Sequence, residues 1–213
     1  MFLHVLFYKP WRSFQGFLLA KFLLGGSTMP KSNVRNLVMI SLLTAMSLVL
    51  MYAIQIPLLP AAPFLKWDPS DLPNVLGGVI LGPWAAVIIT FIKCLLFLLF
   101  KGTSGPIGSF MAFASGIALA VPCSIIYRRW SNHYGLLFGL ATGTVVLTIT
   151  MVLVNYYWAL GVYGIPAELH LGLVKTTVLP FNLLRGILSS VLIYPVYLAL
   201  RQPLAKLIKP KAC

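Results

Sequence analysis

The chain has 213 residues, of which 60% are hydrophobic and only 9% are charged. Soluble domains carry about 25% charged residues, so this composition excludes an ordinary soluble domain and indicates a polytopic membrane protein. The formal net charge of +13 comes from 16 Lys and Arg against 3 Asp and Glu. The positive-inside rule explains such an excess in a membrane protein, and no basic stripe with interleaved aromatics points to nucleic acid.

Residues 1–28 are apolar and basic, but Lys and Pro interrupt them too often for a convincing span or signal peptide. The following Met29-Pro30-Lys31 looks like a natural start. We therefore expect 1–28 to be an N-terminal extension or an interfacial segment, and 29–213 to form one membrane domain.

The apolar runs predict an all-α bundle of six transmembrane helices, because a span takes about 20 mostly apolar residues. The predicted spans cover residues 37–56, 70–81, 84–100, 109–127, 136–160 and 177–200. The second is short, begins with Ser70 or Asp71 as N-cap, and ends at Gly82-Pro83. Turns or loops are expected at 101–108, 128–135 and 161–175.

Small side chains recur every four residues along the first predicted span, at Ser41, Ala45, Val49 and Ala53. This spacing places them on one helical face, and small faces let another membrane helix approach closely. Two interpretations stay open: the face contacts a separate membrane subunit, or it fills the core of this bundle.

Between the first two spans lies a proline-rich loop with Pro at 57, 60, 63, 69 and 73, which should keep the backbone out of a regular helix. The loop holds Asp68 and Asp71, two of the three acids of the chain. Because lipid-exposed irregular backbone is costly, the loop should lie outside the membrane or line a protein-covered space.

Lys and Arg are distributed unevenly between the two sides of this topology. Three fall in outside loops, at Lys66, Lys101 and Lys175, and two fall inside spans, at Lys93 and Arg185. The remaining eleven lie on the other side: Lys9, Arg12, Lys21, Lys31, Arg35, Arg128, Arg129, Arg201, Lys206, Lys209 and Lys211. The asymmetry predicts that both termini are cytoplasmic and that the proline-rich loop faces outward.

Charged residues within spans are costly and often mark function. Asn182 and Arg185 lie one turn apart on one face, where an amide and a guanidinium fork could bind the polar edge of a flat ligand. The alternative is an Arg that snorkels to the outer interface. Asn155, near the outer end of the fifth span, should also face the bundle interior.

Lys93 lies in the middle of the third span, where it could pair with Asp68 or Asp71 or snorkel to a boundary. The two Asp residues could equally brace the loop, cap the second helix or form structural ion pairs. No GxSxG, HExxH or Walker A motif is present, and no Cys/His cluster suggests a metal site. We therefore expect neither enzymatic activity nor a cofactor.

The ordered set of motifs resembles the substrate-binding S components of energy-coupling factor (ECF) vitamin transporters, most closely the riboflavin-specific branch. The resemblance covers residues 29–200 and rests on the segments Phe64–Pro73, Gly77–Pro83, Lys93–Gly102, Asn155-Tyr156 and Pro180–Gly186.

This resemblance implies a six-helix S component in the bacterial cell membrane. It would bind riboflavin from outside, under the loop between the first two helices, and assemble with a coupling membrane subunit and two ATP-binding subunits. Ser41 and Ala45 match the family's contact with the coupling subunit. The implied ligand contacts are Asn155, Asn182, Arg185, Leu65, Lys66 and Tyr156.

The sequence departs from the family pattern at three places. Arg185 stands where the branch usually has Lys, and Ser109 and Ala112 replace an expected Glu and Asn. The ligand could therefore be flavin mononucleotide, because an Arg fork favours an anion, or another vitamin. Two alternatives from other classes are a stand-alone proton-coupled carrier and a small membrane transferase.

Overall fold

The computed structural model describes residues 31–59, 65–100 and 105–208. The chain divides into two compact units, Met1–Arg35 and Asn36–Cys213. Of the first unit only residues 31–35 are described, so the predicted extension 1–28 lies outside the described residues. The second unit contains the helices of the bundle, and the helix Lys31–Ala53 leads into it.

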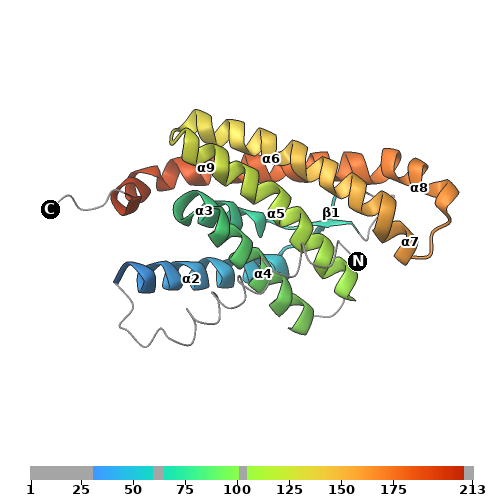
Figure 1. Cartoon of the computed structure of the whole chain (residues 1–213), viewed down its shortest axis with the longest axis horizontal. Helices are drawn as coiled ribbons and strands as arrows, with labels where there is room; N and C mark the ends of the chain where they lie inside the picture. The colour runs from blue at the N-terminus through green and yellow to red at the C-terminus, as the bar shows by residue number, and fades with distance from the viewer. Residues whose placement is uncertain (1–30, 60–64, 101–104, 209–213) are drawn as a thin grey trace, which may run out of the picture. The chain divides into compact units, whose positions relative to one another are not determined.

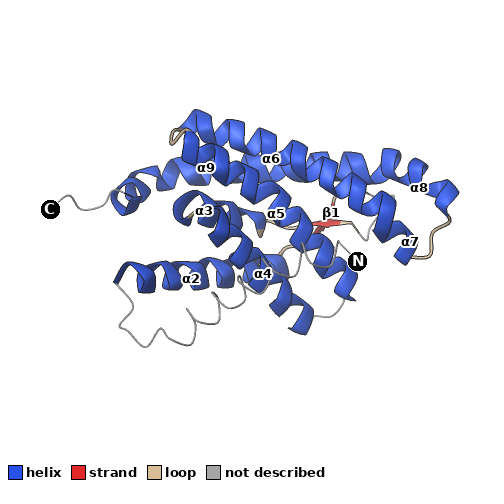
Figure 2. Cartoon of the chain, viewed as in Figure 1, coloured by secondary structure: helices blue, strands red, loops and turns tan. Residues whose placement is uncertain are grey.

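Helices make up nearly all of the described chain (Figures 1 and 2). Helix α2 spans Lys31–Ala53, α3 Asp71–Leu81, α4 Pro83–Phe100 and α5 Gly105–Arg129. Helix α6, His133–Val154, continues through the π-helical turn η1, Asn155–Ala159, into α7, Leu160–Val162. The last continuous helix consists of α8, Ala167–Leu173, the π-helical turn η2, Val174–Val178, and α9, Leu179–Ile208. The predicted all-α bundle of six helices is confirmed.

Within the described residues, five helices are long and apolar enough to cross a membrane. They are Val34–Ala53, Pro83–Phe100, Gly105–Arg129, His133–Val162 and Ala167–Leu200. The sixth, α3, has 11 residues, about 17 Å at 1.5 Å per residue. A hydrocarbon core is about 30 Å thick, so α3 reaches only about halfway across it.

Three expected loop boundaries are wrong. The predicted outside loop 161–175 is a turn of four residues, 163–166, and the next helix begins at Ala167. Residues 105–108, predicted as part of a turn, are the first turn of α5. Pro73 lies in the first turn of α3 rather than in irregular backbone; a proline is tolerated there because that N–H has no intrahelical acceptor.

A proline also explains why the last helix is not uniformly α-helical. Pro180 has no N–H to donate to the carbonyl of Thr176, and the π-helical turn η2 ends two residues before it, at Val178. Such π turns absorb an extra residue within a helix. This local adjustment lets one helix continue from α8 into α9 past a residue that would otherwise break it.

The proline-rich loop contains a short β ladder that the sequence did not predict. β1, Ile56–Pro57, pairs antiparallel with β2, Lys66–Trp67, with Ile56 opposite Trp67. The ladder fixes the two ends of the loop, so that β2 leads directly into α3.

The apolar core is formed mainly where α5 packs between α4 and α6, and where α6 packs against α9. Two glycines of α6 allow the closest approach: a Cβ at Gly139 or Gly143 would lie 2.9 Å from the Cys123 carbonyl oxygen or 2.6 Å from that of Leu119. Both carbonyls belong to α5. The α5–α6 contact therefore depends on glycines that let the backbones of the two helices approach closely.

Candidate functional site

One face of α9 carries a row of buried polar side chains: Asn182, Arg185 and Ser189 are 2%, 7% and 2% exposed. Their spacing of three and four residues places them on one side of the helix. The Asn182 Nδ2 donates to the Val178 carbonyl oxygen at 2.8 Å. The Asn182 Oδ1 has no hydrogen-bond partner among the described residues.

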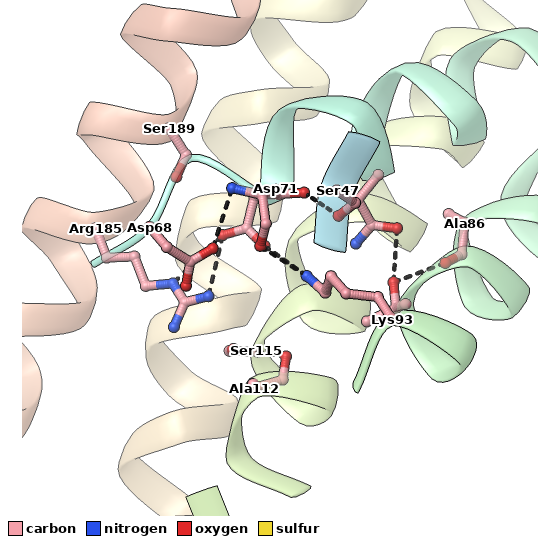
Figure 3. A network of polar contacts seen from close by, with 12 residues as sticks. Ser47, Asp68, Asp71, Ala86, Lys93, Ala112, Ser115, Arg185 and Ser189 are labelled. Atoms are coloured by element: carbon pink, nitrogen blue, oxygen red, sulfur yellow. Dashed lines mark hydrogen bonds and ion pairs between the residues drawn. The ribbon is translucent and has the colours of Figure 1, made fainter. Parts of the chain in front are cut away.

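Arg185 pairs with Asp71, which lies in the first turn of α3 and is fully buried. The Arg185 Nε and Nη2 donate to the same oxygen, Asp71 Oδ2, at 3.3 and 3.1 Å. Arg185 therefore does not snorkel to an interface but joins α9 to α3 inside the bundle (Figure 3). Removing one partner of such a buried pair typically costs about 3–5 kcal/mol.

Lys93 reaches the same cluster from α4 and is 1% exposed. Its Nζ donates to the Ser70 Oγ at 2.9 Å and lies 4.0 Å from Asp71 Oδ1. Of the alternatives that the sequence left open for Lys93, the structure contains the pairing with Asp71. Asp71 thus lies between two cations that come from two different helices (Figure 3).

Asp68 organises the turn that leads into α3. Its Oδ1 accepts a hydrogen bond from the Ser70 N–H at 3.0 Å, an Asx-type turn. The Ser70 carbonyl oxygen accepts from the Ser47 Oγ of α2 at 2.7 Å. Ser70 occupies the N-cap position of α3, but its side chain makes no cap hydrogen bond and instead accepts from Lys93.

Several members of this network were missed by the sequence reasoning. The Trp67 Nε1 donates to the Ser189 Oγ at 3.2 Å, which joins β2 to α9. The Thr90 Oγ1 donates to the Asn74 Oδ1 at 2.6 Å, whereas the buried Asn74 Nδ2 has no partner among the described residues. Asn74 follows Asp71 by one helical turn, and this spacing was the signal available for it.

The remaining predicted ligand contacts do not all lie with this cluster. Asn155 is buried in η1, where its Nδ2 donates to the Met151 carbonyl oxygen at 2.7 Å. Tyr156 is 37% exposed, and its ring contacts Tyr157 and His170. Lys66 is exposed and Leu65 is half-buried.

Asn155 is nevertheless placed close to the start of α9 by the backbone. The two π-helical turns η1 and η2 lie against each other, and Asn182 follows η2 by four residues. π-helical turns are rare and occur often at functional sites. Here they bring the C-terminal end of α6 close to the α9 segment that carries Asn182.

The predicted partner face of α2 is open. Ser41, Ala45, Val49 and Ala53 are all exposed within this chain, whereas Thr44, Ser47 and Met51 are buried against the bundle. The interpretation that the small residues fill this chain's own core is therefore wrong.

Among the described residues there is no group of three or more His, Cys, Asp or Glu that could hold a metal ion. The site consists instead of two carboxylates, two cations, amides and hydroxyls. Such an arrangement can bind and orient a polar molecule by hydrogen bonding. Ser109 is buried on α5.

Known proteins are similar to this chain in sequence and in fold. The family model described as "ECF transporter, substrate-specific component" matches residues 35–197. The riboflavin transporter RibU of Streptococcus thermophilus is 34% identical over 185 residues, 83% of this chain and 87% of that protein. The riboflavin transporter FmnP of Bacillus subtilis is 30% identical over 178 residues, 79% of this chain and 93% of that protein.

A solved structure of the S component of a bacterial ECF transporter is similar in fold, with a TM-score of 0.71 and 31% sequence identity. The match covers 81% of this chain and 98% of that structure.

Proposed function

Because this chain belongs to the family of ECF transporter substrate-specific components, we propose that it is the riboflavin-binding membrane subunit of an ATP-driven vitamin uptake system. It captures the vitamin at the outer face of the bacterial membrane and does not alter it chemically. Curated relatives named as riboflavin transporters support this ligand, at 34% and 30% identity over most of both chains.

The observation that carries the proposal is the buried polar face of α9. Asn182 offers an unpartnered acceptor oxygen inside the bundle, as far as the described residues extend, and an unpaired buried polar atom costs about 1–3 kcal/mol. A bound ligand with a donor group removes that cost. The isoalloxazine ring of riboflavin supplies a flat edge of donors and acceptors that suits an amide such as Asn182 or Asn155.

The ATP-binding and coupling subunits are supplied by partner proteins, since this sequence has no Walker A motif. The exposed face formed by Ser41, Ala45, Val49 and Ala53 of α2 fits close approach of another membrane helix. We assign the contact with the coupling subunit to this face. Ligand contacts are assigned to Asn155, Asn182 and Arg185, with Leu65, Lys66 and Tyr156 around them.

The orientation follows from charge. The excess of Lys and Arg in the terminal segments and at Arg128-Arg129 supports a topology with both termini in the cytoplasm. The β1–β2 loop and the start of α3 then face the outside, where the vitamin arrives.

A binding titration tests the ligand. The purified chain in detergent should quench riboflavin fluorescence with a saturable isotherm, and riboflavin should raise its melting temperature, since a ligand that binds the native state stabilises it. The absence of both effects in folded protein would refute the assignment. Riboflavin uptake that persists without the coupling and ATP-binding subunits would instead favour a stand-alone carrier.

A further inference from the structure

Four charged side chains are buried together at this site, and their formal charges sum to zero. Asp68 and Asp71 are 7% and 0% exposed, and Lys93 and Arg185 are 1% and 7% exposed. They come from the loop before α3 and from α3, α4 and α9, and Figure 3 shows the two carboxylates between the two cations. The protein thus carries its own counter-ions.

The positions of both carboxylates are fixed by the protein itself. Asp71 accepts two hydrogen bonds from Arg185, and Asp68 accepts one from the Ser70 N–H. Arg185 in turn commits Nε and Nη2, one edge of its guanidinium, to Asp71. One of the two edges through which a guanidinium can bind a phosphate in a bidentate manner is therefore already occupied by a carboxylate.

We propose that Asp68 and Asp71 determine the charge of the ligand: by cancelling Lys93 and Arg185, they make the site select an uncharged flavin over a flavin that carries a phosphate. This inference rests on the proposed function above. It argues against the alternative that the sequence left open, in which Arg185 in place of the usual Lys favours an anion.

The physical reason is the cost of an unmatched charge in a poorly solvated site. A phosphate monoester carries about −1.5 to −2 charges at pH 7. If it displaced Asp71 from Arg185, a fully buried carboxylate would lose its main partner; if it did not, it would enter a site without net positive charge. Riboflavin adds no charge and requires only hydrogen-bond partners such as Asn182.

The test compares two ligands in each of several purified variants. Riboflavin and flavin mononucleotide are titrated into wild type, Asp68→Asn, Asp71→Asn, Asp71→Glu and Glu168→Gln, and the ratio of the two Kd values is the readout. Because both Kd values come from the same protein, a general loss of folded or competent protein cancels in the ratio.

We expect wild type to prefer riboflavin by about tenfold or more, which corresponds to ~1.4 kcal/mol. Asp68→Asn and Asp71→Asn should each shift the ratio about tenfold toward the phosphorylated ligand, because each leaves the site with one net positive charge. Asp71→Glu keeps the charge and should keep the wild-type ratio.

Two of these variants distinguish an effect of charge at the site from misfolding and from a change in overall net charge. Asn at position 68 retains an acceptor oxygen for the Ser70 N–H, so Asp68→Asn changes charge with little structural cost even if Asp71→Asn does not fold. Glu168 is the chain's third acid and is exposed on α8. Glu168→Gln makes the same change of net charge at an exposed position, where solvent screens it, and its ratio should stay at the wild-type value.

The outcomes separate the two proposals. If wild type binds riboflavin but the Asp68→Asn ratio is unchanged, or if Glu168→Gln shifts it equally, the charge-selection inference is overturned and the riboflavin assignment stands. If folded wild type binds neither flavin, the proposed function fails and the inference fails with it.

Discussion

Arg185 of α9 and Asp71 of α3 lie 114 residues apart in the sequence and share two hydrogen bonds to a single carboxylate oxygen. Through this pair the last helix is fixed to the first turn of the short helix that follows the loop. The pair connects the proposed ligand-binding face of α9 to the segment that encloses it. Changes at either residue should therefore affect both folding and binding.

The coupling between these two residues can be measured directly. We expect Asp71→Asn and Arg185→Met each to lower the free energy of unfolding by about 3–5 kcal/mol, because each leaves a buried charge without its partner. The double variant should be less destabilised than the sum of the two. A double-mutant cycle from denaturant unfolding in detergent measures this coupling; strict additivity would show that the pair contributes no net interaction.

Asn182 should contribute to riboflavin affinity. Asn182→Ala removes the unpartnered Oδ1 and should raise the riboflavin Kd by about tenfold, in line with the ~1–3 kcal/mol of a polar group left unpaired. Fluorescence titration provides the measurement. The matched control is Asn132→Ala, which removes the N-cap hydrogen bond to the Gly135 N–H of α6: it should cost about 1 kcal/mol of stability and leave the Kd unchanged. Equal effects on the two Kd values would contradict the assignment.

The exposed face of α2 should matter for transport and not for binding. Ala45→Leu enlarges a small exposed residue and should hinder close approach of the coupling subunit. We expect riboflavin binding by the isolated chain to persist while uptake by the complete transporter is lost. Met46→Phe adds bulk about 100° around the same helix and serves as the control. A loss of binding in Ala45→Leu would show that the division of roles is wrong.

The α5–α6 contact should tolerate no side chain at Gly143. A Cβ there would lie 2.6 Å from the Leu119 carbonyl oxygen, so Gly143→Ala should force the helices apart and cost about 1–3 kcal/mol. Gly161 of α7 is the control, because a Cβ there meets nothing within 4 Å. Thermal unfolding in detergent should show a lower melting temperature for Gly143→Ala than for Gly161→Ala, and the opposite order would refute this account of the packing.

The proposed orientation can be tested by labelling. Lys66 and Trp130 are both exposed, one in β2 and one in the turn after α5. With Cys213 replaced by Ser, Lys66→Cys should react with an impermeant maleimide on intact cells, and Trp130→Cys should react only after the membrane is opened. The reverse pattern would invert the topology. Cys94 and Cys123 are buried and should react in neither condition.

The positions of the helices could be predicted from the sequence, whereas the polar contacts between them could not. Apolar runs locate long spans because lipid imposes length and composition on them. The loop predicted over 161–175 is longer than the observed turn, 163–166. Residues 167–178 include polar side chains, which indicated a loop, but these residues are helical.

The sequence limited the possible ion-pair partners of Lys93 and Arg185 to a few residues but did not identify them. Lys93 and Arg185 stood out because a charge within a span needs a partner, and with three acids in the chain the candidates were few. That Asp71 lies between both cations, and that Trp67 reaches Ser189, depends on how β2 and α3 enter the bundle. No local pattern in the sequence encodes this geometry.

The distribution of these charges along the chain also constrains how the protein is made. Asp71 and Lys93 are synthesised and inserted well before Arg185, which arrives 114 residues after Asp71. A lone charge at the centre of a membrane helix costs about 2.5–3.5 kcal/mol during insertion. Helices α3 and α4 can lower this cost for each other, because Asp71 and Lys93 are 4.0 Å apart in the folded protein. A nascent chain that ends before α9 therefore holds an ion cluster that still lacks Arg185, the main partner of Asp71.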